Sequence, residues 1–275
     1  MEVAELATAL ELCAGGGAGL NAEHRAAMAA ALPLLRCHYR FERVRFWGCI
    51  QAVRGAYYIT EGCGLDRAAP RSRLYSFDCV EWSLLPLVTE EMLADTQQLQ
   101  GRFWGDPSFE YEYPEINAED PERLSEDIKE QRIKEEVRLV ATIEKIDREV
   151  GIIPRGAFVK TPLGSVHENR SFEGLSLMEA TKLRSYFHFT EPVNLKNKTL
   201  LEKADLDPSI DFLDSLEHDI PQGSWKVQLE KGGTVVILWS LLWPGLTFYH
   251  ILNTKQYGYM YFGTGEKNLD LPFML

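Results

Sequence analysis

Cysteine is scarce in this chain, and no two cysteines stand at CxxC spacing. The five cysteines among 275 residues are an odd number at loose spacings, which is typical of free thiols in a reducing compartment. No apolar run approaches the roughly 18 residues that a membrane-spanning helix needs. The first residues carry an early acid and no basic region, so they do not resemble a signal peptide. These absences favour a cytosolic protein without disulfides or a membrane segment.

Positive charge is also in short supply. The chain has 29 lysines and arginines against 41 aspartates and glutamates, giving a net charge of −12. This balance disfavours nonspecific binding to nucleic acid or to an anionic membrane. The hydrophobic content of 45% is enough for a packed core. The length and composition suit one α+β domain over residues 1–275.

Motifs that carry chemistry are missing as well. None of the six histidines stands at HxH, HxxxH or HExxH spacing, and the chain has no GxSxG sequence. The glycine-rich residues 15–19 have no strand before them and no Lys-Ser/Thr after them, as a phosphate loop requires. The sequence therefore predicts no catalytic residue, no cofactor and no metal site. An enzyme with a site assembled from scattered residues, for instance around His250 and Glu266, is the alternative.

The C-terminal residues 223–275 carry the clearest structural pattern. Residues 225–230 alternate apolar and polar, and two glycines at 232–233 provide a hairpin turn. Residues 234–243 are apolar on both faces, so both faces should be covered. Two further strands are expected at residues 246–252 and 257–262. The result is an antiparallel four-stranded meander.

The rest of the chain is expected to flank this meander. Strands within residues 39–77 form a second small sheet or extend the meander, with a bulge or close backbone approach at Gly48. A long helix with one apolar stripe runs from Ile133 to Val150, either packed along the sheet or docked on a partner. Shorter helices are expected at residues 177–186, 195–204 and 205–219, the first opened by a capping box at Ser176. Asn21 and Thr89 are the expected N-caps of the second N-terminal helix and of a helix over residues 89–98. The sub-regions are an N-terminal helix pair (1–38), first strands and a helix (39–116), an acidic segment with the long helix (117–150), a helical and loop region (151–222) and the meander (223–275).

Aromatic residues are more abundant in the meander than one sheet face can bury. Aromatic side chains beyond the needs of a core are typical of protein interfaces. A purely structural role in the core is an equal alternative for any single one. The candidate interface residues are Trp225, Trp239, Trp243, Tyr249, Tyr257, Tyr259 and Tyr261.

Several long and unusual strings then identify a relationship. They occupy residues 81–86 (EWSLLP), 153–156 (IPRG), 172–176 (FEGLS), 196–208, 212–221, 240–250 and 263–275. Together they closely resemble the family of radial spoke head protein 9, from about Tyr39 to the last residue. The variable parts are the first 35 residues and the acidic segment near residues 117–132. The strings WPG and GYMYFG are also similar to spoke head proteins 4 and 6, which suggests a shared C-terminal fold.

The resemblance implies a non-catalytic subunit of the radial spoke head in the axoneme of motile cilia and flagella. It implies that the chain packs beside a spoke head protein of the 4/6 type, with radial spoke head protein 1 nearby, and that the assembled head meets the central pair apparatus. We expect the 4/6-type partner to contact the second face of residues 234–243 or an edge of the meander. A third hypothesis is that the acidic exterior sets a weak or repulsive contact with the central pair.

Overall fold

The computed structural model describes the chain apart from residues 1–2, 14–18, 65–68, 115–129 and 275. Its centre is an eight-stranded mixed sheet in the order β11-β12-β13-β14-β1-β2-β3-β4. The first strands are β1 (Arg43–Gln51), β2 (Ala56–Cys63), β3 (Ser72–Ser76) and β4 (Ser83–Leu84). The last strands are β11 (Trp225–Glu230), β12 (Val235–Ser240), β13 (Leu246–Ile251) and β14 (Tyr257–Gly263). The predicted α+β class and the antiparallel C-terminal meander are confirmed.

The first strands extend the meander, which settles the choice between one sheet and two. The junction is a parallel pairing of β1 with β14, in which Gly48 lies opposite Tyr261. Gly48 has a φ of 152°, and a Cβ at this position would lie 2.1 Å from the carbonyl oxygen of Tyr261. Only glycine tolerates this approach, so the expected bulge and close backbone contact at Gly48 are confirmed.

One face of the sheet is covered by the long helix α4 (Glu135–Val150). Leu139, Val140, Ile143 and Ile146 of this helix are fully buried in a cluster that includes Trp47 of β1. The helix therefore packs along the sheet and is largely buried, whereas its sequence suggested a charged rod with one apolar stripe. The helix begins two residues later than expected, at Glu135, because Ile133 lies in β6 (Glu130–Lys134), which pairs with β5 (Glu110–Pro114).

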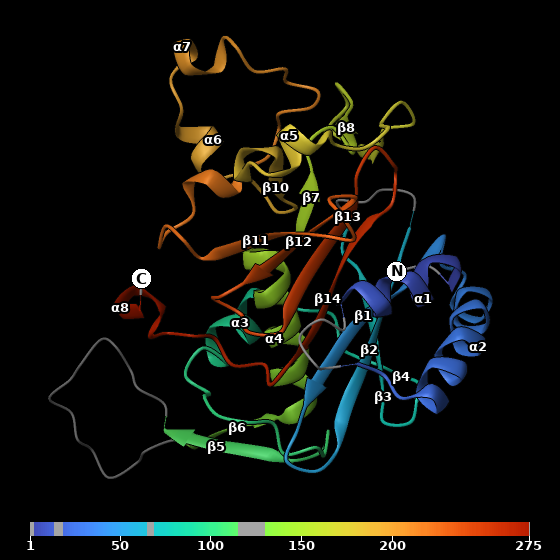
Figure 1. Ribbon diagram of the computed structural model, residues 1–275. Coiled ribbons are helices and arrows are strands. Elements are labelled where there is room, and N and C mark those ends of the chain that lie inside the picture. The colour runs from blue at the N-terminus through green and yellow to red at the C-terminus, as the bar shows by residue number, and fades with distance from the viewer. Residues whose placement is uncertain (1–2, 14–18, 65–68, 115–129, 275) are drawn as a thin grey trace, which may run out of the picture.

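The opposite face is covered by the N-terminal helices α1 (Val3–Cys13) and α2 (Ala22–Tyr39) (Figure 1). Asn21 caps α2, as expected, by accepting a hydrogen bond from the backbone N–H of His24 at 2.6 Å. The helix runs through Pro33 and ends at Arg40, whose φ of 55° is left-handed. The prediction of a strand from Tyr39 onward was therefore early, and β1 begins at Arg43. The glycine-rich residues 15–18 lie outside the described residues.

Residues 151–222 form a lobe at one end of the sheet, at the top of Figure 1. Its elements are β7 (Ile152–Pro154), β8 (Phe158–Lys160), β9 (Val166–Glu168), α5 (Leu177–Ala180), η2 (Leu183–Ser185), β10 (Tyr186–His188), α6 (Asn194–Asn197), α7 (Leu200–Lys203) and η3 (Leu216–His218). Two further short helices stand outside it, α3 (Glu90–Asp95), capped by Thr89, and α8 (Leu271–Met274). No described helix is long and apolar enough to cross a membrane.

None of the three helices expected in the lobe has its predicted extent. The helix expected at residues 195–204 is divided into α6 and α7, because Lys198 between them is extended. The expected helix at residues 205–219 is absent apart from the short η3, because polar side chains bind the backbone instead. Asp207 accepts the N–H of Ser209 at 2.9 Å, and Asp211 is held by Arg155 at 2.6 and 2.8 Å. The capping box at Ser176 is confirmed, but its helix ends at Ala180 rather than at Tyr186.

Candidate functional site

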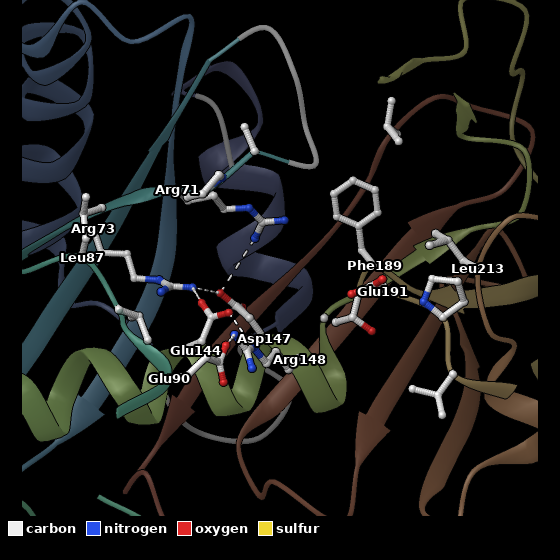
Figure 2. Close-up of a pocket in the computed structure, with 18 of the residues that line it drawn as sticks. Arg71, Arg73, Leu87, Glu90, Glu144, Asp147, Arg148, Phe189, Glu191 and Leu213 are labelled. Atoms are coloured by element: carbon white, nitrogen blue, oxygen red, sulfur yellow. Dashed lines mark hydrogen bonds and ion pairs between the residues drawn. The ribbon is translucent and has the colours of Figure 1, made fainter. Parts of the chain in front are cut away.

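A cleft of about 960 Å³ lies between the sheet, α4 and the lobe. Figure 2 shows Arg71 and Arg73 on one side, and Glu144 and Asp147 rising from α4 beside them. Phe189 lines the opposite side, where the lobe begins. Any chemistry in the cleft would depend on the charged groups of its inner wall.

Those groups belong to a buried ionic cluster made by β1, β2, β3 and α4. Its centre is Glu61, which is only 1% exposed. Its carboxylate lies 2.6 Å from a guanidinium nitrogen of Arg45, 3.4 Å from Arg71 and 3.3 Å from Arg73. The ionic cluster consists of Arg45, Glu61, Arg71, Arg73, Glu144 and Asp147.

Asp147 is the second anchor of the ionic cluster. It accepts hydrogen bonds from the indole N–H of Trp47 at 2.8 Å, the hydroxyl of Tyr259 at 2.9 Å and Arg73 at 2.8 Å. Arg73 also donates to Glu144 at 2.7 Å. Helix α4 is therefore tied by polar bonds to three different strands of the sheet, β1, β3 and β14.

The electrostatics of the ionic cluster separate its two central carboxyls. Burial by itself would raise the pKa of Glu61, but the guanidiniums of Arg45, Arg71 and Arg73 hold that pKa well below its usual value. Burial, followed by the negative charge of Glu61, raises the pKa of Asp147 to about 6 against the opposing effect of Arg73. The facing guanidiniums therefore dominate at Glu61, whereas burial dominates at Asp147.

The charged groups of the ionic cluster contact one another within the chain. Each central carboxylate is already bound by cations or hydrogen-bond donors of the chain. In the part of the chain that the structure describes, no three His, Cys, Asp or Glu residues gather as a metal site would need. None of the five cysteines forms a disulfide, and burial raises the pKa of Cys13, Cys49 and Cys79 to about 12.

A further buried carboxylate, Glu135, fixes the first turn of α4. It accepts the backbone N–H groups of Trp104 and Gly105, each at 2.7 Å, and the hydroxyl of Tyr57 at 2.6 Å. The hydroxyl of Tyr111 donates to it as well. Sequence reasoning missed both Glu135 and the ionic cluster. The only local signal was an acid in the first turn of a long helix, which is also common on exposed helices.

The seven aromatic residues proposed for an interface occupy different environments. Trp225, Trp243, Tyr249, Tyr259 and Tyr261 are buried within this chain. Trp239 and Tyr257 keep part of their surface exposed. The indole of Trp243 donates to Glu149 at 2.8 Å, and that of Trp225 to Asp219 at 2.7 Å. Most of these aromatics therefore supply the core, and the interface role stays a prediction.

The residues suggested for a scattered catalytic site are not brought together. His250 lies opposite Tyr257 at the start of β14, whereas Glu266 follows Gly263 at the other end of that strand. His250 is fully buried, where it accepts the N–H of Leu175 at 2.9 Å and contacts the carbonyl of Gln256 at 3.1 Å. Its contacts are those of a structural histidine.

Fold and site together define an α+β protein whose buried charges hold helix and sheet together. No family model matches the chain. It is 58% identical to the radial spoke head protein 9 homolog of Homo sapiens over 276 residues, covering 100% of both chains. The homologs of Bos taurus and Mus musculus are 58% and 56% identical with the same coverage.

The chain belongs to the radial spoke head protein 9 family. It is therefore a radial spoke head component, which places it in the axoneme of the cilium or flagellum. The resemblance drawn from the strings quoted above is confirmed, and it extends over the full length of the chain, including the first 35 residues.

Proposed function

We propose that this chain is a non-catalytic structural subunit, required for assembly of the spoke head and for signalling from the spoke to the central pair. The observation that carries the proposal is that the charged groups of the cleft pair with one another. Its inner charges bind one another, with Arg73 bonded to Glu61, Glu144 and Asp147. Such a wall makes the subunit rigid and leaves its outer surface for partners.

The proposed partners are a spoke head protein of the 4/6 type and radial spoke head protein 1, with the central pair apparatus reached through the assembled head. Helices α1 and α2 cover the second face of β12. On that face we therefore expect the 4/6-type partner to contact only the margin that the two helices leave open. Trp239 lies at this margin and is part exposed, with the ammonium of Lys226 4.9 Å from its ring centroid. Tyr257 is the other part-exposed aromatic of the meander.

Co-expression with a 4/6-type partner tests this assignment. Trp239→Ala and Tyr257→Ala are compared with Leu163→Ala, a change at a side chain that is 96% exposed outside the meander. We expect recovery of the complex to fall at least tenfold for one of the aromatic variants, because aromatic anchors dominate most interfaces. The control should keep full recovery. Full recovery by both aromatic variants, with unchanged thermal unfolding, would overturn the assignment.

The acidic exterior supports a second proposal about the contact with the central pair. The chain carries a net charge of −12, and exposed charges act over about 8 Å at physiological salt. We expect the contact between assembled heads and the central pair to change as ionic strength rises from 50 to about 300 mM. Mechanical or binding measurements across that range that show no change would exclude an electrostatic contribution.

A further inference from the structure

Strand β11 is one edge of the eight-stranded sheet. It is six residues long, whereas β4 at the other edge has two. Among the described residues, β11 pairs with β12 alone. A regular edge strand of this length presents unpaired backbone groups and is a template for another strand.

The ladder with β12 fixes which backbone groups point outward. The N–H of Leu241 donates to the carbonyl of Ser224 at 2.9 Å, so Ser224 belongs to a hydrogen-bonded pair. Antiparallel pairs alternate, and every second residue after Ser224 therefore also faces β12. The residues between them, Val227 and Leu229 among others, direct their N–H and C=O groups to the open side.

The side chains of β11 leave this edge accessible. Lys226 and Gln228 are exposed, and Leu229 is 42% exposed. Val227 is half buried and packs against the core on the α4 side of the sheet. Successive side chains alternate between faces, so Lys226, Gln228 and Glu230 share one face while Val227 and Leu229 share the other.

The charges of β11 are complementary to themselves when the strand is reversed. In an antiparallel register centred on Gln228, Lys226 lies opposite Glu230 of a second strand, and Glu230 opposite its Lys226. These are non-hydrogen-bonded pairs, in which side chains approach most closely. Val227 then pairs with Leu229 through the outward backbone groups. Moving the centre to either neighbouring residue leaves Lys226 without a facing acid.

We propose that β11 pairs with β11 of a second copy of this chain about a two-fold axis at Gln228. The two sheets then form one continuous sheet across the dimer. The interface is isologous, so each copy contributes the same lysine and the same glutamate. It uses backbone groups and charges, and it leaves the part-exposed ring of Trp239 on the face of the sheet. The inference goes beyond the proposed partner contact and is tested without that partner.

Charge reversal of the full-length chain, followed by sedimentation velocity over a concentration series, tests the pairing. Lys226→Glu or Glu230→Lys alone places like charges opposite each other at two positions. Each single variant should dimerise at least tenfold more weakly than the wild type. The double variant K226E/E230K should recover wild-type dimerisation. An equimolar mixture of the two single variants should form a heterodimer, because every pair is then complementary.

Lys182→Glu, a reversal at an exposed residue outside β11, is the control and should leave the dimer unchanged. Thermal unfolding of each variant establishes that the fold is intact. A wild-type chain that stays monomeric throughout the series overturns the proposal, as do single variants that dimerise normally or a double variant that does not recover. If both single variants lose binding to the 4/6-type partner and the double variant does not regain it, the edge of β11 binds that partner. That result also overturns the proposal.

Discussion

The two faces of the central sheet are sealed in different ways. Helix α4 covers one face with apolar side chains and also with the ionic cluster, in which Arg73 and Asp147 are buried with their partners. Helices α1 and α2 cover the other face with an apolar cluster that includes Met28 and Leu32. Directional bonds fix the position of α4 on the sheet, whereas the N-terminal helices depend mainly on buried area. The α4 face should therefore be the more specific in geometry and the less tolerant of change.

The largest effect is expected from breaking the ionic cluster. Glu61→Gln removes the negative charge that faces Arg45, Arg71 and Arg73, and leaves buried guanidiniums undercompensated. The free energy of unfolding should fall by about 3–5 kcal/mol, as measured by urea denaturation. Glu112→Gln, which removes an exposed partner of Arg132, is the control and should cost less than about 1 kcal/mol. Equal losses in the two variants would contradict the comparison.

The apolar face should respond less strongly to loss of volume. Leu32→Ala empties a site that is 1% exposed and should cost about 2–3 kcal/mol, because the N-terminal helices, held mainly by apolar contacts, can move to fill part of the cavity. Leu34→Ala on the same helix is the control, since Leu34 is 69% exposed, and should change stability by less than about 0.5 kcal/mol. Hydrogen exchange should show faster exchange in α2 than in α4 for L32A. Equal acceleration in both helices would show that the two faces are not independent.

The α4 face should also carry the stronger pH dependence. Burial lowers the pKa of His250 below 6.5, so the unfolded chain binds a proton first as pH falls. The stability that neutral His250 contributes is complete above pH 6.5 and is lost as pH falls toward its folded pKa. The raised pKa of Asp147 acts in the opposite sense below pH 6, since there the folded state binds the proton first.

A substitution at His250 separates the two effects. The stability difference between wild type and His250→Gln should shrink as pH falls from 7 to 5, by about 1.4 kcal/mol for each unit by which the pKa is lowered. His218→Gln, at an exposed histidine, should give the same pH profile as the wild type. A difference between wild type and H250Q that stays constant over this range would contradict the assignment.

The smallest effect is expected for a charge at the margin of the apolar face. Glu11 of α1 pairs with Lys231 at 2.9 Å, and the two side chains are 69% and 47% exposed. Glu11→Gln should change the free energy of unfolding by less than about 1 kcal/mol in the denaturation assay used for E61Q. A loss above 2 kcal/mol would mean that charge also matters structurally on this face.

Local patterns in the sequence were sufficient for the meander and for several helix ends. Alternation and the two turns at Gly232 and Gly245 located β11 to β14, and the caps at Asn21 and Thr89 located two helix starts. The periodic apolar residues at 206–216 predicted a helix that does not form, since aspartate side chains in that stretch bind the backbone and Arg155. Short-range polar bonds outweighed helical periodicity there.

Long-range features could not be predicted from the same patterns. The parallel pairing of β1 with β14 joins segments far apart in the chain, and no local signal marks it. Glu61 stands between Thr60 and Gly62 in β2, and Arg73 between Ser72 and Leu74 in β3, so nothing in their local sequence indicates that these charges are buried. They are buried because α4 brings Asp147 and Glu144 over them. The cover supplied by α1 and α2 was also missed, since their alanine-rich sequence gives no sign of what they pack against.

The place of β14 in the sheet has a consequence for synthesis of the protein. It is the last strand in the sequence, yet it lies between β13 and β1, at the middle of the sheet. A nascent chain therefore cannot join its first strands to the meander until Tyr257–Gly263 have left the ribosome. Until then β1 offers an open apolar edge, which is the kind of surface that chaperones bind. A premature stop before Tyr257 would remove β14, the strand that joins the meander to the first strands of the sheet.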